Sequence, residues 1–401
     1  MKIKKLVIIF CTIFLTIGFL LYYQYSTPRY EEDFSITMSQ KKAKEVKYEL
    51  SNYISTINDI LKEDPMDGYT LSTGTPSLSK QGVKKIMNYL SKQSVCITSQ
   101  QGYYNLIHPE IFKDFWNHYQ NNKSCSFVLY DIEQNGCIRR QEFIYDTKQI
   151  YFYSTSYTLL NGKMTDIHSY GNIIEKMTFD ENGYFCYHLK FPEVYYRLGI
   201  NNIHTIKIEP IDEECRLYNQ KYIEPIGYHC NNLFIQDWDS RTLDKLEFTD
   251  LIEYLYTIDS NKPFTFDLYK QSDTPFIGNI DADLFEALVT KHFNISIKNL
   301  RDWNHYNKNN HSYPYDEVYC IASKFEPPTL KSEVIKVEHK SQYTILTIKA
   351  TGYEKGYPIA FIHKVTLQEN GKDFKYISNE IIESKDNKIP QYVPGITCDN
   401  Y

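Results

Sequence analysis

Two kinds of hydrophobic periodicity follow one another along this chain. In residues 39–63, apolar side chains recur at spacings of three and four, which predicts an amphipathic helix with Ser39 as its N-cap. The same pattern predicts a helix after Ser79 and another from Pro109, since proline is favourable at the first helical position. From Cys125 the period changes to two, which is typical of β-strands.

The alternating segments predict an antiparallel sheet. They cover residues 126–132, 137–145, 149–159, 173–179 and 184–191. Asn-Gly pairs separate several of these segments, and such pairs favour tight hairpin turns. Helices followed by hairpins predict an α+β domain over residues 39–191, with its helices packed on one face of the sheet.

A second helix-then-sheet unit is predicted over residues 281–383. Asp281 and Ser296 are placed as N-caps of two helices. The strands expected after them cover residues 318–323, 334–338, 343–351, 359–368 and 374–382. Two helices followed by a curved antiparallel sheet is the plan of cone-shaped, nuclear-transport-factor-like domains, an analogy of fold that transfers no activity. A middle section of short strands and a helix, residues 192–280, and a tail, residues 384–401, complete the predicted organisation.

The N-terminal stretch, residues 6–23, carries no charge. As a helix it would be about 27 Å long, close to the hydrocarbon thickness of a bilayer. Lysines precede it and Glu31, Glu32 and Asp33 follow it, so the positive-inside rule orients the N-terminus towards the cytoplasm. We therefore predict a single-pass cell-membrane protein with a cytoplasmic tail at residues 1–5, a transmembrane helix, a linker at residues 24–38 and an extracytoplasmic body.

Two other interpretations of this stretch remain open. It is longer than the apolar core of a typical cleaved signal peptide, and no small-x-small cleavage site follows it. A buried helix of a soluble protein is the third interpretation. The retained membrane helix is the favoured one.

Composition limits the class of function. The chain has 401 residues, of which 42% are hydrophobic and 23% charged, in the range of ordinary globular proteins. Its formal net charge of -6 argues against nucleic acid as a partner. The nine cysteines include no C-x-x-C pair, which argues against a zinc module. Cys125 and Cys137 flank the first hairpin and are the one disulfide pair that the sequence suggests.

Histidines on apolar faces are the candidate chemistry. His363 lies on the apolar side of its predicted strand, and His292 lies on the apolar side of its predicted helix. Either could line a ligand pocket or act as a base, and either could be a core residue with satisfied hydrogen bonds. His229 and Asp237 belong to a short His- and Asp-containing segment whose spacing matches no metal loop. The common hydrolase, zincin and nucleotide-binding motifs are absent, so no catalytic residue, metal or cofactor is assigned.

Five further segments are informative together, namely residues 222–238, 246–256, 281–303, 332–337 and 374–381. They resemble a family of uncharacterised bacterial envelope proteins. The resemblance covers roughly residues 37–383 and implies an envelope-anchored protein of a Gram-positive bacterium. That family has no established activity, so the resemblance passes on no catalytic residues. This chain differs from lipoprotein-like members in lacking a lipidation cysteine.

The sequence therefore supports three functional hypotheses. The first is a membrane-anchored, non-catalytic binding or envelope-structural module whose partner is an envelope protein or a wall polymer. The alternative is an exported hydrolase acting on a cell-surface substrate, with His363 or the region of His229 and Asp237 in its site. The third, a membrane-tethered sensor, is disfavoured because a tail of residues 1–5 is too short to signal alone.

Overall fold

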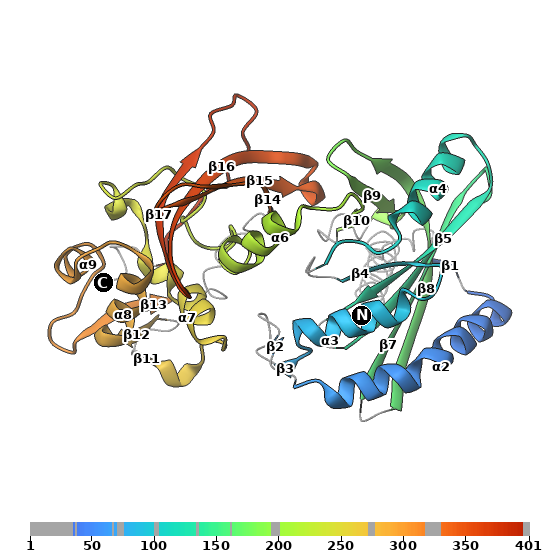
Figure 1. Cartoon of the computed structure of the whole chain (residues 1–401), viewed down its shortest axis with the longest axis horizontal. Helices are drawn as coiled ribbons and strands as arrows, with labels where there is room; N and C mark the ends of the chain where they lie inside the picture. Colours follow the sequence, from blue (N-terminus) through green and yellow to red (C-terminus); the bar gives the residue numbers. More distant parts are fainter. Residues whose placement is uncertain are drawn as a thin grey trace, which may run out of the picture.

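The computed structural model shows a protein of two lobes lying side by side (Figure 1). We call residues 35–207 the N-terminal lobe and residues 213–395 the C-terminal lobe. The residues that the structure describes are 35–36, 38–65, 68–69, 76–99, 104–133, 136–160, 163–193, 201–271, 277–316 and 330–395.

The N-terminal lobe is built on one large sheet. Its helices are α2 (Gln40–Glu63), α3 (Lys80–Leu90) and α4 (Pro109–Gln120). Its strands are β1 (Ser35–Ile36), β2 (Gly68–Tyr69), β3 (Pro76–Ser77), β4 (Cys96–Ser99), β5 (Cys125–Ile132), β6 (Ile138–Tyr145), β7 (Ile150–Leu160), β8 (Lys163–Phe179), β9 (Tyr184–Leu189) and β10 (Ile203–Lys207). The sheet order is β10-β9-β8-β7-β6-β5-β4, with β1 paired to β8 and β2 paired to β3 apart from the sheet. All neighbours in the large sheet are antiparallel except β4 and β5, which run parallel.

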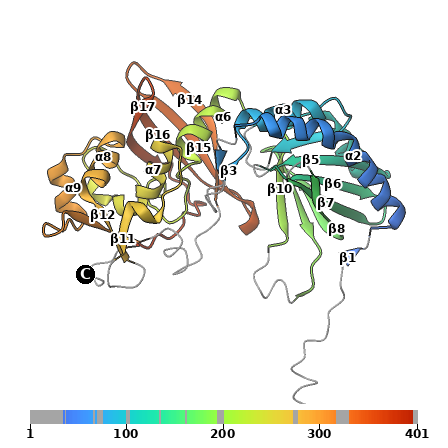
Figure 2. The ribbon, with the colours of Figure 1, turned by 90° about the horizontal axis from the view of Figure 1, so that it is seen from below.

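Helices cover both faces of this sheet, which corrects the prediction that they pack on one face. Phe127 and Leu129 of β5 belong to a core shared with α4, where Phe112 is fully buried. Tyr130 and Ile132 of the same strand belong to a second core, shared with α2 and α3. Since successive residues of a strand point to opposite faces, α4 lies on one face and α2 and α3 on the other (Figure 1). Figure 2 shows α2 and α3 together along their side of the sheet.

The C-terminal lobe has two smaller sheets. Its helical elements are α6 (Glu213–Tyr218), η1 (Asn219–Ile223), η2 (Leu243–Lys245), η3 (Phe248–Leu251), α7 (Ile252–Ser260), η4 (Phe266–Leu268), α8 (Ala282–His292), α9 (Ile297–Trp303) and η5 (Tyr353–Lys355). Its strands are β11 (Tyr269–Gln271), β12 (Ile277–Asp281), β13 (Ser312–Asp316), β14 (Lys331–His339), β15 (Thr344–Gly352), β16 (Tyr357–Asn370) and β17 (Asp373–Ile381). One sheet has the order β11-β12-β13 and the other β14-β15-β16-β17.

The four-stranded sheet of this lobe is curved (Figure 1). The pairing register shifts once in each of its three pairs of neighbouring strands. Such β-bulges bend and twist a sheet. The irregular segment at residues 222–238 packs into the core of the lobe, where Phe234 is fully buried and the Trp238 indole donates to the Leu233 carbonyl at 2.7 Å. The predicted middle section thus shares its core with the C-terminal unit, and the predicted domain boundaries stay a prediction.

Most helix starts are where the sequence predicts them. Ser39, Ser79 and Ser296 each accept a hydrogen bond from the backbone N–H three residues on, and Asp281 accepts one from Asp283. Pro109 is the first residue of α4. The strand predicted at residues 318–323 lies outside the described residues.

The predicted transmembrane helix must be corrected. In the part of the chain that the structure describes, no helix is long and apolar enough to cross a membrane. The longest one, α2, buries Val46, Leu50 and Ile57 on the sheet, but it carries lysines and glutamates over the rest of its surface. Residues 1–5 and 6–23 lie outside the described residues. The fold is therefore α+β, and the single-pass membrane location predicted with that helix is not supported.

Polar contacts join the two lobes. The Lys207 ammonium of β10 donates to both carboxylate oxygens of Glu333 in β14, at 3.0 and 3.1 Å. The Tyr184 hydroxyl donates to the same carboxylate at 2.5 Å. Beside this pair, Lys349 donates to the Asn182 side chain at 2.7 Å. The junction is thus ionic and hydrogen-bonded, which is typical of an interface between domains.

Candidate functional site

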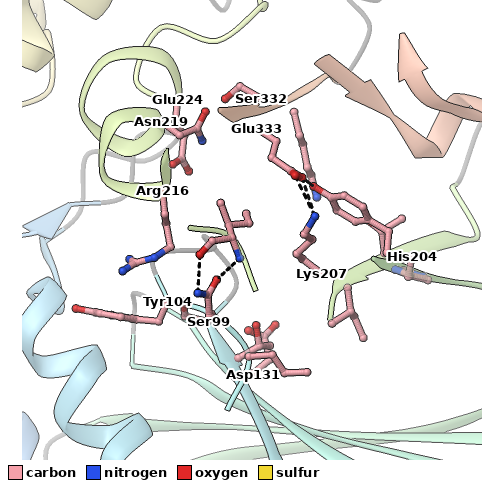
Figure 3. Close-up of a pocket in the computed structure, with 18 of the residues that line it drawn as sticks. Ser99, Tyr104, Asp131, His204, Lys207, Arg216, Asn219, Glu224, Ser332 and Glu333 are labelled. Carbon is pink, nitrogen blue, oxygen red and sulfur yellow. Dashed lines mark hydrogen bonds and ion pairs between the residues drawn. The ribbon is translucent and has the colours of Figure 1, made fainter. Parts of the chain in front are cut away.

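A cavity of about 510 Å³ lies between the lobes. The N-terminal lobe contributes strands β4, β5, β6, β9 and β10 to its wall, and the C-terminal lobe contributes α6, η1 and β14. Small-molecule sites have volumes of this order and occur often at domain interfaces. Figure 3 shows Ser99 and Asp131 on the strand side and Asn219 and Glu224 on the helical side.

The strands contribute polar side chains to the cavity wall because β5 and β6 carry polar residues at one end of the sheet face that α4 covers. Leu129 and Asp131 are two residues apart in β5 and therefore point to the same face. Leu129 is opposite Gln141 of β6, and Asp131 is opposite Arg139. One face of the sheet is thus apolar beneath α4 and polar further along, where the C-terminal lobe lies opposite.

Two aromatic groups and an ion pair form the neighbouring wall. Tyr187 of β9 is paired with His204 of β10, and their rings stack with centroids 5.1 Å apart. Burial, together with the charge of Arg139, lowers the pKa of His204, so its ring is neutral near pH 7. The ion pair is that of Lys207 with Glu333.

The helical side of the cavity is formed by a capped α-helix that continues into a π-helical turn. The Asp212 side chain accepts from the Cys215 N–H at 3.1 Å and so caps α6. The chain then continues into η1, a π-helical turn that begins at Asn219. Single π-helical turns are frequent at functional sites. Asn219, Gln220 and Glu224 from this region line the cavity.

Four buried polar atoms in the wall have no hydrogen-bond partner among the residues that the structure describes. They are Ser99 Oγ, Asp131 Oδ1, His204 Nε2 and Asn219 Oδ1. The Ser99 and Asp131 residues are 4% and 8% exposed, respectively. Buried polar atoms are hydrogen-bonded in most native proteins. Four buried polar atoms without such bonds around one cavity therefore indicate that a polar ligand or ordered water forms hydrogen bonds with them.

Two carboxyl groups of the cavity hold their protons unusually strongly. Burial raises the pKa of Asp131 to about 6, against the opposing effect of the Arg139 and Lys331 charges. Glu224 contacts solvent in the cavity, yet the protein around it raises its pKa to about 7, against the charges of Lys80 and Lys331. Carboxyl groups with pKa values near neutrality are common in binding and catalytic sites.

The two predicted pocket residues lie elsewhere. His363 is fully buried in β16, where Tyr228 Oη lies 2.9 Å from its Nε2 and Asn379 Oδ1 lies 2.7 Å from its Nδ1. Burial lowers the pKa of His363 to about 4, so the ring is neutral. His292 packs in the core of the lobe with its ring centroid 4.8 Å from that of Phe374. Neither lines the cavity between the lobes, and their role in a ligand pocket stays a prediction.

The segment with His229 and Asp237 is structural. The His229 carbonyl accepts from Tyr254 at 2.7 Å, and the Asp237 carboxylate accepts from the Ile381 N–H at 2.6 Å. Across the described ranges, no three His, Cys, Asp or Glu side chains are grouped so that they could hold a metal ion.

The suggested disulfide between Cys125 and Cys137 is wrong. Cys125 begins β5 and is opposite Tyr145, whereas Cys137 precedes β6 at the other end of the hairpin. The Cys125 thiol is free.

No sequence motif marks the residues of the cavity, so the sequence alone does not predict them. One signal was present: Asp131 interrupts the apolar run of β5, residues 125–132. A carboxylate inside a strand that is apolar on both faces needs a compensating partner or a function.

The fold and the cavity define an α+β protein of two lobes with a polar cavity between them. The chain belongs to the family of unknown function DUF6070, which it matches over residues 43–394. This confirms the predicted resemblance to an uncharacterised family.

The other comparisons add little. No curated protein matches the chain. Among solved structures, it matches an "Ntf2 like protein involved in plasmid conjugation" at 9% identity, over 79% of this chain and 91% of that chain, with a TM-score of 0.13. A TM-score this low does not establish a shared fold, so the analogy to cone-shaped domains stays a prediction.

Proposed function

We propose that this protein is a binding module that takes a small polar molecule into the cavity between its lobes. The observation that carries the proposal is the set of four polar atoms around one cavity of about 510 Å³ that have no hydrogen-bond partner among the described residues. Leaving such atoms unsatisfied costs about 1–3 kcal/mol each, so a ligand that bonds to them gains affinity from the cavity itself.

The partner predicted from the sequence, an envelope protein or a wall polymer, remains a proposal, as does the Gram-positive envelope as the setting of the family. The sequence resemblance supports both. The end unit of a wall polymer is a ligand of suitable size for this cavity.

A bulky residue in the cavity tests the proposal. Ser332 of β14 lines the cavity, and Ile335 of the same strand is exposed outside it, so Ser332→Trp and Ile335→Trp form a matched pair. The purified full-length chain is screened by thermal shift against amino acids, nucleotides, organic acids and sugars. We expect compounds that stabilise the native chain and the Ile335→Trp control but not Ser332→Trp, with far-UV circular dichroism unchanged in both variants. A screen in which every stabilising compound acts equally on both variants, or none acts, would refute binding in the cavity.

One observation favours hydrolysis as a second candidate function. Asp131 and Glu224 line the same cavity with pKa values of about 6 and about 7, a range suited to general acid–base catalysis. A hydrolase here would use these two groups rather than His363 or His229. The test is turnover of nitrophenyl glycosides or esters. Hydrolysis is established if Glu224→Gln abolishes turnover while Glu380→Gln, an exposed control on β17, leaves it unchanged. Absence of turnover leaves the binding module as the function.

A further inference from the structure

Three of the four lysines and arginines in the described wall of the cavity are paired. Three cations of the wall each have a carboxylate partner: Lys207 with Glu333 at 3.0 Å, Arg216 with Glu213 at 3.7 Å, and Arg139 with Glu133. A site built for an anionic ligand presents cations that only the ligand neutralises. These three already have carboxylate partners in the protein, so among the described residues of the wall only Lys331 remains to attract an anion.

The remaining charges of the wall also balance. Lys331 of β14 acts electrostatically on both Asp131 and Glu224, lowering the pKa of each. Burial raises the pKa of Asp131 to about 6, and the protein around Glu224 raises its pKa to about 7, so the two carboxyl groups together carry less than their full charge near pH 7. Lys331 in the wall opposes the negative charge that remains. A cationic ligand would therefore meet Lys331, which is unpaired among the described residues, and two partly protonated acids, which is a poor electrostatic match.

The unpartnered atoms include both donors and acceptors. The Ser99 hydroxyl donates or accepts, Asp131 Oδ1 accepts when ionised, and Asn219 Oδ1 accepts. His204 Nε2 donates or accepts according to its tautomer. A ligand complementary to such a mixture carries groups that both donate and accept, and the hydroxyl group is the simplest of these.

The wall also contains ring surfaces between its polar atoms. Tyr187 is stacked on His204 on one side, and Tyr104 lies on the other with the Arg216 guanidinium 5.6 Å from its ring centroid. The wall is therefore not purely polar, and a ligand with apolar C–H surface beside its hydroxyl groups fits it. A pyranose has both.

We propose that the cavity binds a neutral, polyhydroxylated ligand, a mono- or disaccharide, through hydroxyl groups that bond to the four unpartnered atoms. This inference rests on the proposed binding function and names its ligand class. It excludes charged ligands of the same size as the preferred occupants.

Calorimetric titration of the purified full-length chain tests the inference. The probes are the neutral sugars glucose, N-acetylglucosamine, maltose and diacetylchitobiose, the cation glucosamine and the anion glucuronate. We expect at least one neutral sugar to bind about tenfold or more tightly than the charged sugars. Equal or tighter binding of glucosamine or glucuronate overturns the inference, and so does the absence of binding by all four neutral sugars at concentrations up to about 10 mM.

Matched variants locate the binding and separate the two proposals. Asn219→Ala removes an unpartnered oxygen of the cavity, and Asn299→Ala changes the same residue type on the exposed surface of α9. We expect Asn219→Ala to weaken sugar binding about tenfold and Asn299→Ala to leave it unchanged, because one hydrogen bond is worth about 1 kcal/mol or slightly more. If a charged compound binds at least as tightly as the neutral sugars and Asn219→Ala weakens its binding, the saccharide proposal is overturned but the binding-module proposal stands. If no compound of the thermal-shift screen is sensitive to Asn219→Ala or to Ser332→Trp, both proposals fail.

Discussion

Glu333 is the residue whose loss should reveal most about how the lobes are held together. It is 7% exposed, and its carboxylate accepts from Lys207 and from Tyr184, both on the other lobe. Replacing it with glutamine keeps its size and removes its charge. The Lys207 ammonium then stays in the interface without a counter-ion, and the Tyr184 hydroxyl loses a charged acceptor.

The size of the effect follows from burial. Removing one partner of a fully buried ion pair costs about 3–5 kcal/mol. The Lys207 side chain is 21% exposed and keeps its bond to the Asn182 carbonyl at 2.7 Å, so part of its charge remains solvated. We therefore expect Glu333→Gln to lower the free energy of unfolding by about 2–3 kcal/mol.

Urea denaturation measures this loss. Tryptophan fluorescence reports on both lobes, because Trp116 lies in α4 and Trp238 and Trp303 lie in the C-terminal lobe. The matched control is Glu338→Gln in the same strand, whose carboxylate forms a surface pair with Lys336 at 3.2 Å and should cost less than about 1 kcal/mol.

A double-mutant cycle separates the ion pair from other effects. If the pair is energetically coupled, Lys207→Met should cost less in the Glu333→Gln background than in the native protein. Additivity within about 0.5 kcal/mol, or equal losses for Glu333→Gln and Glu338→Gln, would refute the reasoning.

Three further predictions concern the cores. Phe112→Ala should lower the free energy of unfolding by about 3–5 kcal/mol in urea, since the ring is fully buried under α4, whereas the exposed Tyr48→Ala should cost less than about 0.5 kcal/mol. Burial raises the pKa of Asp250 to about 7, so its protonated form stabilises the fold and its contribution is lost as pH rises from about 4 through 7; Asp250→Asn should flatten the fall in unfolding free energy over that range. Burial lowers the pKa of His363 to about 4, so its contribution to stability is present above about pH 6.5 and lost as pH falls towards 4. His363→Gln should flatten that loss of unfolding free energy, and nuclear magnetic resonance should find the native His363 ring neutral at about pH 5. An unchanged pH profile in either variant contradicts the corresponding pKa shift.

Much of the secondary structure could be predicted because its signals are local. Ser39, Ser79 and Ser296 are helix caps in the structure as in the sequence pattern, since a cap depends on residues only three positions apart. The β5–β6 hairpin was found for the same reason. By contrast, β4 has four residues and is completed only by its parallel partner β5, so no short-range pattern marks it.

The placement of helices on both faces of the sheet could have been inferred. Strand β5 has the sequence CSFVLYDI, in which apolar residues are nearly continuous rather than alternating. A continuous apolar run is typical of a strand that is buried on both faces. Treating this run as one half of an alternating hairpin led to the prediction that helices cover a single face.

The cavity could not be predicted, because its residues come from elements far apart in the sequence. Ser99 is at the end of β4, Asn219 begins η1 and Glu333 lies in β14. Each of them is an ordinary polar residue in its own segment. Only the packing of the lobes brings them around one space, and that packing depends on long-range contacts such as Lys207 with Glu333.

The same ion pair links ligand binding to the packing of the lobes. Lys207 and Glu333 line the cavity and also join the two lobes, so a ligand held between the lobes binds only when they are docked. Such a ligand must raise the stability of the docked form, and a variant that weakens docking must weaken binding. Glu333→Gln should therefore raise the dissociation constant of a cavity ligand, while a saturating ligand should restore part of the variant's lost stability. If Glu333→Gln lowers the free energy of unfolding and leaves the dissociation constant unchanged, the ligand is held by one lobe alone, and the cavity between the lobes is not its site.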